Sequence, residues 1–218
     1  MSYALRKSRF LFLPFYCELK LKFKGDDMFF QVSTIAILIA FYGFYIAKII
    51  VQNKKSIKTN QMGMGNKSKK VLHVEKIMSL ATVLAMIADV CSIFAVKDFP
   101  VVQVRIAGIM LGILAVGFFA AATITMKNSW RVGIPEEKTA LVTNGIYKWS
   151  RNPAFVGFDL LYLAVCFLFF NIPLLVISIW AAVMLHLQVL QEEEHMEKMF
   201  GEDYINYREH TFRYFGKR

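Results

Sequence analysis

The chain has 218 residues, of which 56% are hydrophobic, and its mean hydropathy is +0.45. This composition excludes a water-soluble domain, because several windows reach the roughly 20 apolar residues that a helix needs to cross a hydrocarbon core of about 30 Å. The net charge of +10 is explained by basic loops on the cytoplasmic side of a membrane.

The composition also argues against two kinds of partner. No basic run is interleaved with aromatic residues in a recognisable module, so we expect no nucleic acid to bind. The three cysteines, Cys17, Cys91 and Cys166, are scattered and match neither a zinc spacing nor a disulfide framework. We therefore expect no metal site.

The beginning of the chain differs from the rest. Residues 1–27 form a basic segment around an apolar run, residues 10–16, that is too short to span a membrane. No small-residue cleavage site follows it, as one would in a signal peptide. A long membrane segment starts at Met28, so we hypothesise that translation begins there and that residues 1–27 are not native. A native protein that begins at Met1 or Ser2 would contradict this hypothesis.

Five apolar runs predict an all-α fold, a polytopic transmembrane helical bundle with about five spans. The predicted spans are residues 29–51, 77–96, 101–126, 153–170 and 174–190. The loops 52–73 and 127–152 are rich in Lys and Arg, so both should be cytoplasmic, with the N-terminus outside and the C-terminus inside. The chain thus divides into the basic segment 1–27, a three-span membrane region 28–126 and a C-terminal region 127–218 with a helical hairpin.

Asp89 and Arg105 lie inside the second and third predicted spans, where charged groups are costly unless they are paired. If the two spans form an antiparallel pair, the longer Arg105 side chain could reach towards Asp89 or out to the headgroups. We favour this structural interpretation over a substrate role.

The fourth and fifth spans form a hairpin around the turn residues 171–173. Folding about residue 172 places Arg151 and Glu193, each 21 positions from that centre, at the same membrane face. Asp159 and His186 lie 13 and 14 positions from it and would share a depth inside the membrane. Charged groups in a bilayer are usually paired with one another or take part in function. The hairpin therefore predicts a functional site rather than a plain membrane anchor.

The start of the fourth span carries a helix-start signal. Asn152 is a favoured N-cap residue and Pro153 suits the first helical position, because its missing N–H would be unpaired there anyway. The free N–H groups of such a start can hold a carboxylate or a phosphate, and Arg151 lies beside them. Gly157, one turn later, leaves space for a ligand or for a neighbouring backbone.

The fifth helix should leave the membrane and continue to Phe200, because residues 174–200 contain no Gly or Pro and Gly201 is a good helix stop. Its emerged turn holds four carboxylates: Glu192, Glu193, Glu194 and Glu197. The cations that could face them are Arg151, Arg208 and Arg213. The alternative is a solvated acidic helix end with ordinary surface pairs.

A short terminal helix is expected after Gly201. One face of it is formed, at helical spacing, by Tyr204, Tyr207, Arg208 and Thr211. This face could also simply lie on headgroups.

Together these motifs resemble a known family. They are Gly145-Ile146-Tyr147, Ser150-Arg151-Asn152-Pro153 with Phe155 and Gly157, the apolar hairpin, Glu192-Glu193, Phe200-Gly201, Tyr204, Tyr207 and Arg213. In this order and at these spacings they resemble the membrane methyltransferases, which comprise isoprenylcysteine carboxyl methyltransferases and phospholipid methyltransferases. The resemblance is tight over the C-terminal third and makes residues 127–218 the expected catalytic region.

The resemblance implies that S-adenosyl-L-methionine binds at the cytoplasmic face and that a lipid-like methyl acceptor enters from the bilayer. The implied cofactor-binding residues are Tyr147, Arg151, Asn152, Pro153, Gly157, Glu192, Glu193 and Tyr204. Glu192 or Glu193 would hold polar or cationic groups of the cofactor, and Arg213 would steer an anionic group of the acceptor. Arg213, Glu193 and Arg151 are the implied catalytic residues. Many relatives have His at the position of Asn152, so an imidazole role is not expected there.

Four functions follow as hypotheses. The first is a methyltransferase that acts on a lipid or prenylated carboxylate, and the second transfers the methyl group to a phospholipid or other lipid amine. The third is a membrane reductase of the sterol or enone type with NADPH, and the fourth is a non-enzymatic membrane interaction protein. We expect an integral protein of the cell membrane whose site faces the cytoplasm; the oligomeric state is left open.

Overall fold

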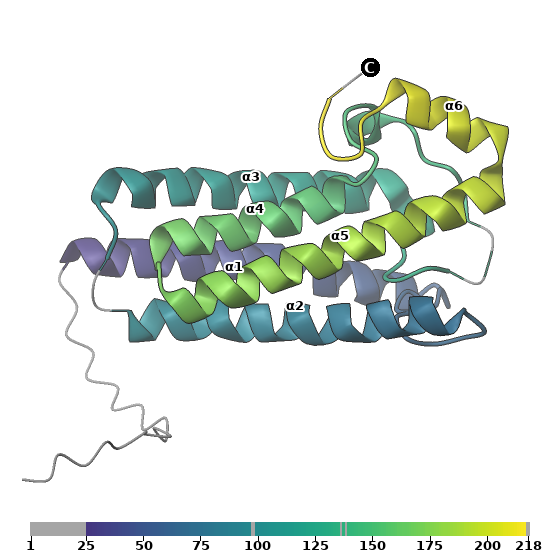
Figure 1. Cartoon of the computed structure of the whole chain (residues 1–218). Helices are drawn as coiled ribbons and strands as arrows, with labels where there is room; N and C mark the ends of the chain where they lie inside the picture. Colours follow the sequence, from purple (N-terminus) through teal and green to yellow (C-terminus); the bar gives the residue numbers. More distant parts are fainter. Residues whose placement is uncertain (1–24, 97–98, 136, 138, 217–218) are drawn as a thin grey trace, which may run out of the picture.

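Within residues 25–96, 99–135, 137 and 139–216, which the computed structural model describes, the chain is a helical bundle without strands. Its long helices are α1 (Gly25–Asn53), α2 (Lys69–Ala95), α3 (Val102–Met126), α4 (Pro153–Leu168) and α5 (Ile172–Phe200). The short helix α6 (Glu202–His210) and two 3-10 turns, η1 (Lys127–Ser129) and η2 (Gly145–Lys148), complete it. In Figure 1, α6 and the loops that follow α1 and α3 gather at one end, which we call the site end. The predicted all-α bundle is confirmed.

Four helical stretches are long and apolar enough to cross a membrane: Asp27–Asn53, Lys69–Ala95, Val102–Ser129 and Ile172–Phe200. The chain is therefore an integral membrane protein. The fourth predicted span is shorter than expected, since α4 has 16 residues and covers about 24 Å at a rise of 1.5 Å per residue. The fifth helix does continue to Phe200, and Gly201 ends it with a positive φ of 55°.

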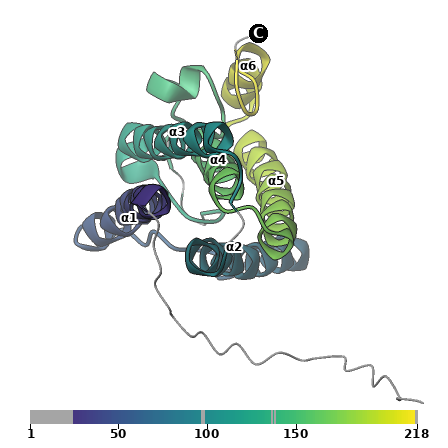
Figure 2. The same cartoon turned by 90° about the vertical axis from the view of Figure 1, so that its left-hand side faces the viewer.

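Helix α4, the shortest of the five long helices, lies in the centre of the bundle with α1, α2, α3 and α5 around it (Figure 2). It packs closely against α3 through two glycines. A Cβ on Gly157 would lie 3.1 Å from the carbonyl oxygen of Ala115, and a Cβ on Gly108 would lie 3.0 Å from that of Ala164. Small residues allow such close backbone packing between membrane helices. Gly157 therefore makes room for a neighbouring backbone.

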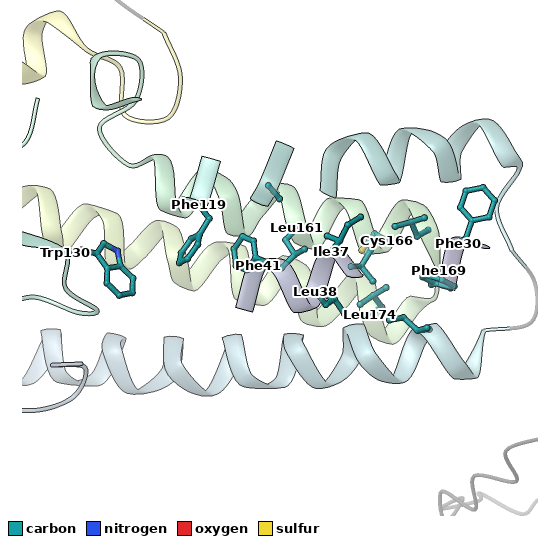
Figure 3. Packing of buried hydrophobic residues seen from close by; sticks show 14 residues of the cluster. Phe30, Ile37, Leu38, Phe41, Phe119, Trp130, Leu161, Cys166, Phe169 and Leu174 are labelled. Atoms are coloured by element: carbon teal, nitrogen blue, oxygen red, sulfur yellow. The ribbon is translucent and has the colours of Figure 1, made fainter. Parts of the chain in front are cut away.

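An aromatic row fills the core and ends at the site end (Figure 3). Phe41 of α1 and Phe119 of α3 are fully buried, and their ring centroids are 4.6 Å apart. Phe119 in turn meets the edge of Trp130 at a centroid distance of 6.2 Å. This packing fixes the loop after α3 against the bundle.

Arg105 does not pair with Asp89, which was one of the two arrangements expected for it. Nη1 of Arg105 lies 2.9 Å from Oδ1 of Asp27 in α1, and the guanidinium stacks over the rings of Phe30 and Phe99 at 3.9 Å and 4.4 Å. Asp89 is buried, and no hydrogen-bond partner for either carboxyl oxygen is found in the described part of the chain. The reason is topological, because α4 lies between the consecutive helices α2 and α3 (Figure 2).

Several expectations concern residues outside the described ranges. These are the basic segment up to residue 24, Lys97 and Asp98 between the second and third predicted spans, and Glu136 and Lys138 of the second basic loop. Helix α1 begins at Gly25, three residues before Met28, and α2 begins at Lys69, so the first basic loop is shorter than predicted.

Candidate active site

The two arms of the hairpin bring their far ends together as predicted. Nη2 of Arg151, just before α4, lies 2.9 Å from Oε1 of Glu193 near the end of α5. The Arg151 side chain is 5% exposed and that of Glu193 is 9% exposed. This is a buried, charge-assisted contact, and such contacts are short and strong.

Glu193 is the centre of a cluster that also contains Arg151, Asn152 and Arg213; we call it the Glu193 cluster. Oε1 accepts from Nε of Arg151 at 3.1 Å and from Nδ2 of Asn152 at 3.0 Å. Oε2 accepts from Nε of Arg213 at 3.0 Å and lies 2.9 Å from its Nη2. The hydrogen bond to Glu193 raises the pKa of Arg213. One carboxylate thus joins the start of α4, the end of α5 and the C-terminal segment.

The guanidinium of Arg151 also holds the chain that follows α6. Its Nη1 donates to the carbonyl oxygens of Thr211 at 2.5 Å and Arg208 at 3.3 Å, and the Arg151 amide donates to Phe212 O at 3.1 Å. Asn152 occupies the N-cap position as predicted, but its side chain makes no capping bond. That side chain is engaged by Glu193 and by Arg213 O instead.

Three tyrosines close the site over the Glu193 cluster. The hydroxyl of Tyr207 donates to Tyr147 O at 2.6 Å, and the rings of Tyr204 and Tyr207 lie 6.2 Å apart. Burial, and then the charge of Glu193, raise the pKa of Tyr204 to about 12. Burial likewise raises the pKa of Tyr147. These phenols are therefore neutral at physiological pH.

A cavity of about 480 Å³ opens beside the Glu193 cluster. Its lining includes the polar side chains of Arg151, Asn152, Glu192 and Glu193, together with aromatic and methionine side chains from α1 to α5. The cavity size lies in the range of small-molecule and cofactor sites, which are mostly apolar with few polar groups.

Six of the residues assigned to the site by resemblance line this cavity: Tyr147, Arg151, Asn152, Glu192, Glu193 and Tyr204. The described residues that line it do not include Pro153, Gly157 or Arg213. Pro153 is buried at the first turn of α4, Gly157 lies against α3, and Arg213 contacts Glu193.

Two further acidic residues of α5 pair with cations. Oε1 of Glu194 lies 2.6 Å from Nζ of Lys198 on the surface, and Oε2 of Glu197 lies 2.5 Å from Nη1 of Arg208. Glu192 instead accepts a hydrogen bond from Gln188 at 2.9 Å. The expected cations therefore face Glu193 and Glu197, whereas Glu194 pairs with a lysine of its own helix.

Asp159 and His186, which were expected at one depth, both lie near Tyr214. The imidazole of His186 hydrogen-bonds to the Tyr214 hydroxyl, and Asp159 is close enough for its charge to act on that phenol. The C-terminal segment therefore folds back onto the hairpin.

Two loops beside the cavity are held by Glu75 of α2, a residue that the sequence did not single out. Glu75 is fully buried and accepts hydrogen bonds from the amides of Gly63 at 2.7 Å and Ile134 at 2.8 Å. Lys67 lies 2.8 Å from the same carboxylate. We call Glu75, Lys67 and these two amides the Glu75 clasp.

Comparison with known proteins supports the resemblance. The family model described as phospholipid methyltransferase matches residues 104–203, from α3 past Glu193 into α6. No curated protein matches the chain. Over residues 104–203 the chain is thus similar to phospholipid methyltransferases, which belong to the group of membrane methyltransferases that the sequence motifs also resemble.

Proposed function

We propose that the protein uses S-adenosyl-L-methionine to methylate a lipid or prenylated carboxylate, in the manner of an isoprenylcysteine carboxyl O-methyltransferase. The observation that carries the proposal is the cavity, whose largely apolar lining also includes Arg151, Asn152 and Glu193 of the Glu193 cluster. The family match over this region favours methyl transfer over an NADPH-dependent reductase and over a non-enzymatic role.

The donor set of the cavity suits this cofactor. Glu192 is a carboxylate on the cavity wall, hydrogen-bonded by Gln188 at 2.9 Å, and can face a cationic group. Aromatic rings such as those of Trp130 and Phe155 offer faces on which an adenine or a cation can lie. The interlocked Glu193 cluster would keep its part of the lining rigid.

An acceptor has a route from the lipid. Ile46 of α1 and Val83 and Met86 of α2 line the cavity, and they are 54%, 47% and 37% exposed. An apolar chain can therefore pass between α1 and α2 without crossing water.

For methyl transfer, the main task of the protein is to align the acceptor with the methyl group of the cofactor. S-adenosyl-L-methionine supplies a methyl group on a sulfonium that carries its own leaving group. The walls have to hold the acceptor in line and exclude water, and such positioning can supply about 7 to 11 kcal/mol. A carboxylate acceptor is already a nucleophile at neutral pH.

A lipid amine is the second candidate acceptor, and Glu192 favours it. An ammonium must lose its proton before it attacks a methyl group, and a carboxylate on the cavity wall can accept that proton. Glu193 is less suited, since both of its oxygens accept bonds from Arg and Asn side chains.

We further propose that the site faces the cytoplasm of the cell membrane. The loops at the site end carry a concentration of basic residues that includes Lys54, Lys55, Lys58, Lys127 and Arg131. Loops of this composition remain on the cytoplasmic side.

The test uses detergent-solubilised full-length protein with radiolabelled S-adenosyl-L-methionine and a panel of prenylcysteine analogues, phospholipids and native lipid extract. Label in a base-labile ester identifies a carboxylate acceptor, and label in an amine identifies the second candidate. Binding of NADPH but not of S-adenosylhomocysteine, or binding of neither with no transfer, would overturn the proposal.

Two neighbouring carboxylates on α5 provide a matched pair of variants. Glu192→Gln alters a residue on the cavity wall, whereas Glu194→Gln alters an exposed pair with Lys198. We expect transfer to an amine to fall about 100-fold in Glu192→Gln, as for loss of a general base, and to persist in Glu194→Gln. Transfer to a carboxylate should depend less on Glu192.

A further inference from the structure

Part of the wall of the cavity comes from two loops. Asn60 and Met62 come from the loop between α1 and α2, and Gly133, Ile134 and Pro135 come from the loop after α3. The first loop lies before the region that matches the family model, which begins at residue 104.

The two loops are joined to each other by few backbone bonds. Gln61 N donates to Val132 O at 2.9 Å, and Val132 N donates to Thr59 O at 3.0 Å, which makes an isolated parallel bridge. An isolated bridge fixes the position of only a few residues. The loops therefore need a further support from the helices below them.

Glu75 provides that support from α2. Its Oε2 accepts from the amide of Gly63 in the first loop, and its Oε1 accepts from the amide of Ile134 in the second. Lys67 pairs with the carboxylate at 2.8 Å and donates to Gln61 O at 2.6 Å. A single buried carboxylate thus holds both loops at once.

Close packing leaves no room for adjustment at this point. Gly133 has a φ of +83°, and a Cβ there would lie 2.9 Å from Oε1 of Glu75 and 3.0 Å from Cα of Met62. The second loop can approach Glu75 only because residue 133 is a glycine.

We propose that Glu75 is a positioning residue of the methyltransferase site, which places the loop wall for the methyl donor without touching it. The inference rests on the proposed function. It means that the three-span N-terminal region completes the donor site rather than serving as an anchor alone.

The experiment measures methyl-donor kinetics and S-adenosylhomocysteine binding for the full chain in detergent. Glu75→Ala leaves the amides of Gly63 and Ile134 without their acceptor and removes the ion pair of Lys67, so we expect the KM for the donor and the Kd for S-adenosylhomocysteine to rise about tenfold or more. The kcat at saturating donor should change far less. Glu75→Gln keeps one acceptor oxygen and should recover part of the loss.

Hydrogen exchange gives a readout that does not depend on activity. In Glu75→Ala the peptides that contain Gly63 and Ile134 should exchange faster, while those of α3 and α5 remain as in the unaltered protein. Glu194→Gln, which alters an exposed ion pair on α5, is the matched control and should change neither binding nor exchange.

Two results for a folded Glu75→Ala protein would overturn the inference. One is an unchanged affinity for the methyl donor, and the other is a kcat that falls by as large a factor as the KM rises. If the Glu75 variants do not fold, Lys67→Gln tests the clasp from its other side, and unchanged donor affinity there also overturns it. Failure of the unaltered protein to bind S-adenosylhomocysteine would instead refute the proposed function, and the exchange data would still report on the loop wall.

Discussion

Two buried glutamates hold the site end together, and they do so with different kinds of partner. Glu193 is bound by side chains, the guanidiniums of Arg151 and Arg213 and the amide of Asn152. Glu75 is bound by two backbone amides and one lysine. Both carboxylates connect chain segments that are far apart in the sequence.

The difference lies in what a substitution leaves behind. Removal of Glu193 takes a shared acceptor from two guanidiniums, whereas removal of Glu75 takes the acceptor from two backbone amides and from Lys67. A buried polar group without a partner is costly, and a buried charge is more so. The two glutamates should therefore respond differently to substitution of their partners.

The largest expected effect is that of Glu193→Ala. Loss of one partner from a buried ion pair typically destabilises a protein by about 3 to 5 kcal/mol, and we expect roughly 3 kcal/mol because the Arg213 side chain is 37% exposed. Thermal unfolding in detergent measures the change. Glu194→Ala is the control. A comparable loss of stability in that variant would contradict the conclusion that Glu193 is the main stabilising carboxylate of this region.

The second-largest loss of stability is expected for Gly133→Ala. The positive φ of 83° and the contact of the new Cβ with Glu75 and Met62 predict a loss of about 2 kcal/mol. Gly117→Ala is a suitable control, since a Cβ there meets nothing within 4 Å. Equal unfolding temperatures for the two variants would contradict the tight fit of the Glu75 clasp.

Arg151→Lys tests whether geometry or charge holds the Glu193 cluster. A lysine keeps the charge but loses the planar fork that bonds Glu193 through two nitrogens and also reaches Thr211 O. We expect a loss of about 1.5 kcal/mol. Urea unfolding measures the change. An unchanged free energy of unfolding would show that a positive charge at residue 151 is enough to hold the Glu193 cluster.

The smallest effect concerns pH and Tyr204. Its pKa in the folded protein is raised to about 12 from the ordinary tyrosine value of 10.0, so its contribution to stability is complete below pH 10 and is lost as the pH rises towards 12. Between pH 10 and 11 this amounts to roughly 1 kcal/mol. Unfolding of Tyr204→Phe should be less sensitive over that window, and parallel pH profiles would contradict the assignment.

Much of the fold followed from local pattern. The apolar runs predicted the helices because a membrane requires long apolar stretches with internally paired backbones, and the extension of α5 to Phe200 followed from helix-breaking residues alone. The contact of Arg151 with Glu193 followed from counting along a symmetric hairpin. In each case the partners are linked by a regular helix of known rise.

Prediction failed where helix neighbours had to be known. Arg105 pairs with Asp27 and not with Asp89, because the central helix α4 separates α2 from α3. The order of helices around a bundle is decided by packing of small and large residues, such as Gly108 against Ala164, and not by their order in the chain.

The sequence by itself determined a membrane protein, its helices and the acidic and basic residues at one end, because hydrophobicity and helical period are local properties. Only the tertiary structure decided which carboxylate serves which role. Glu75 binds backbone amides, which every residue possesses and which therefore leave no mark in the sequence. Its function as a support for the cavity wall becomes visible only when two distant loops are placed in space.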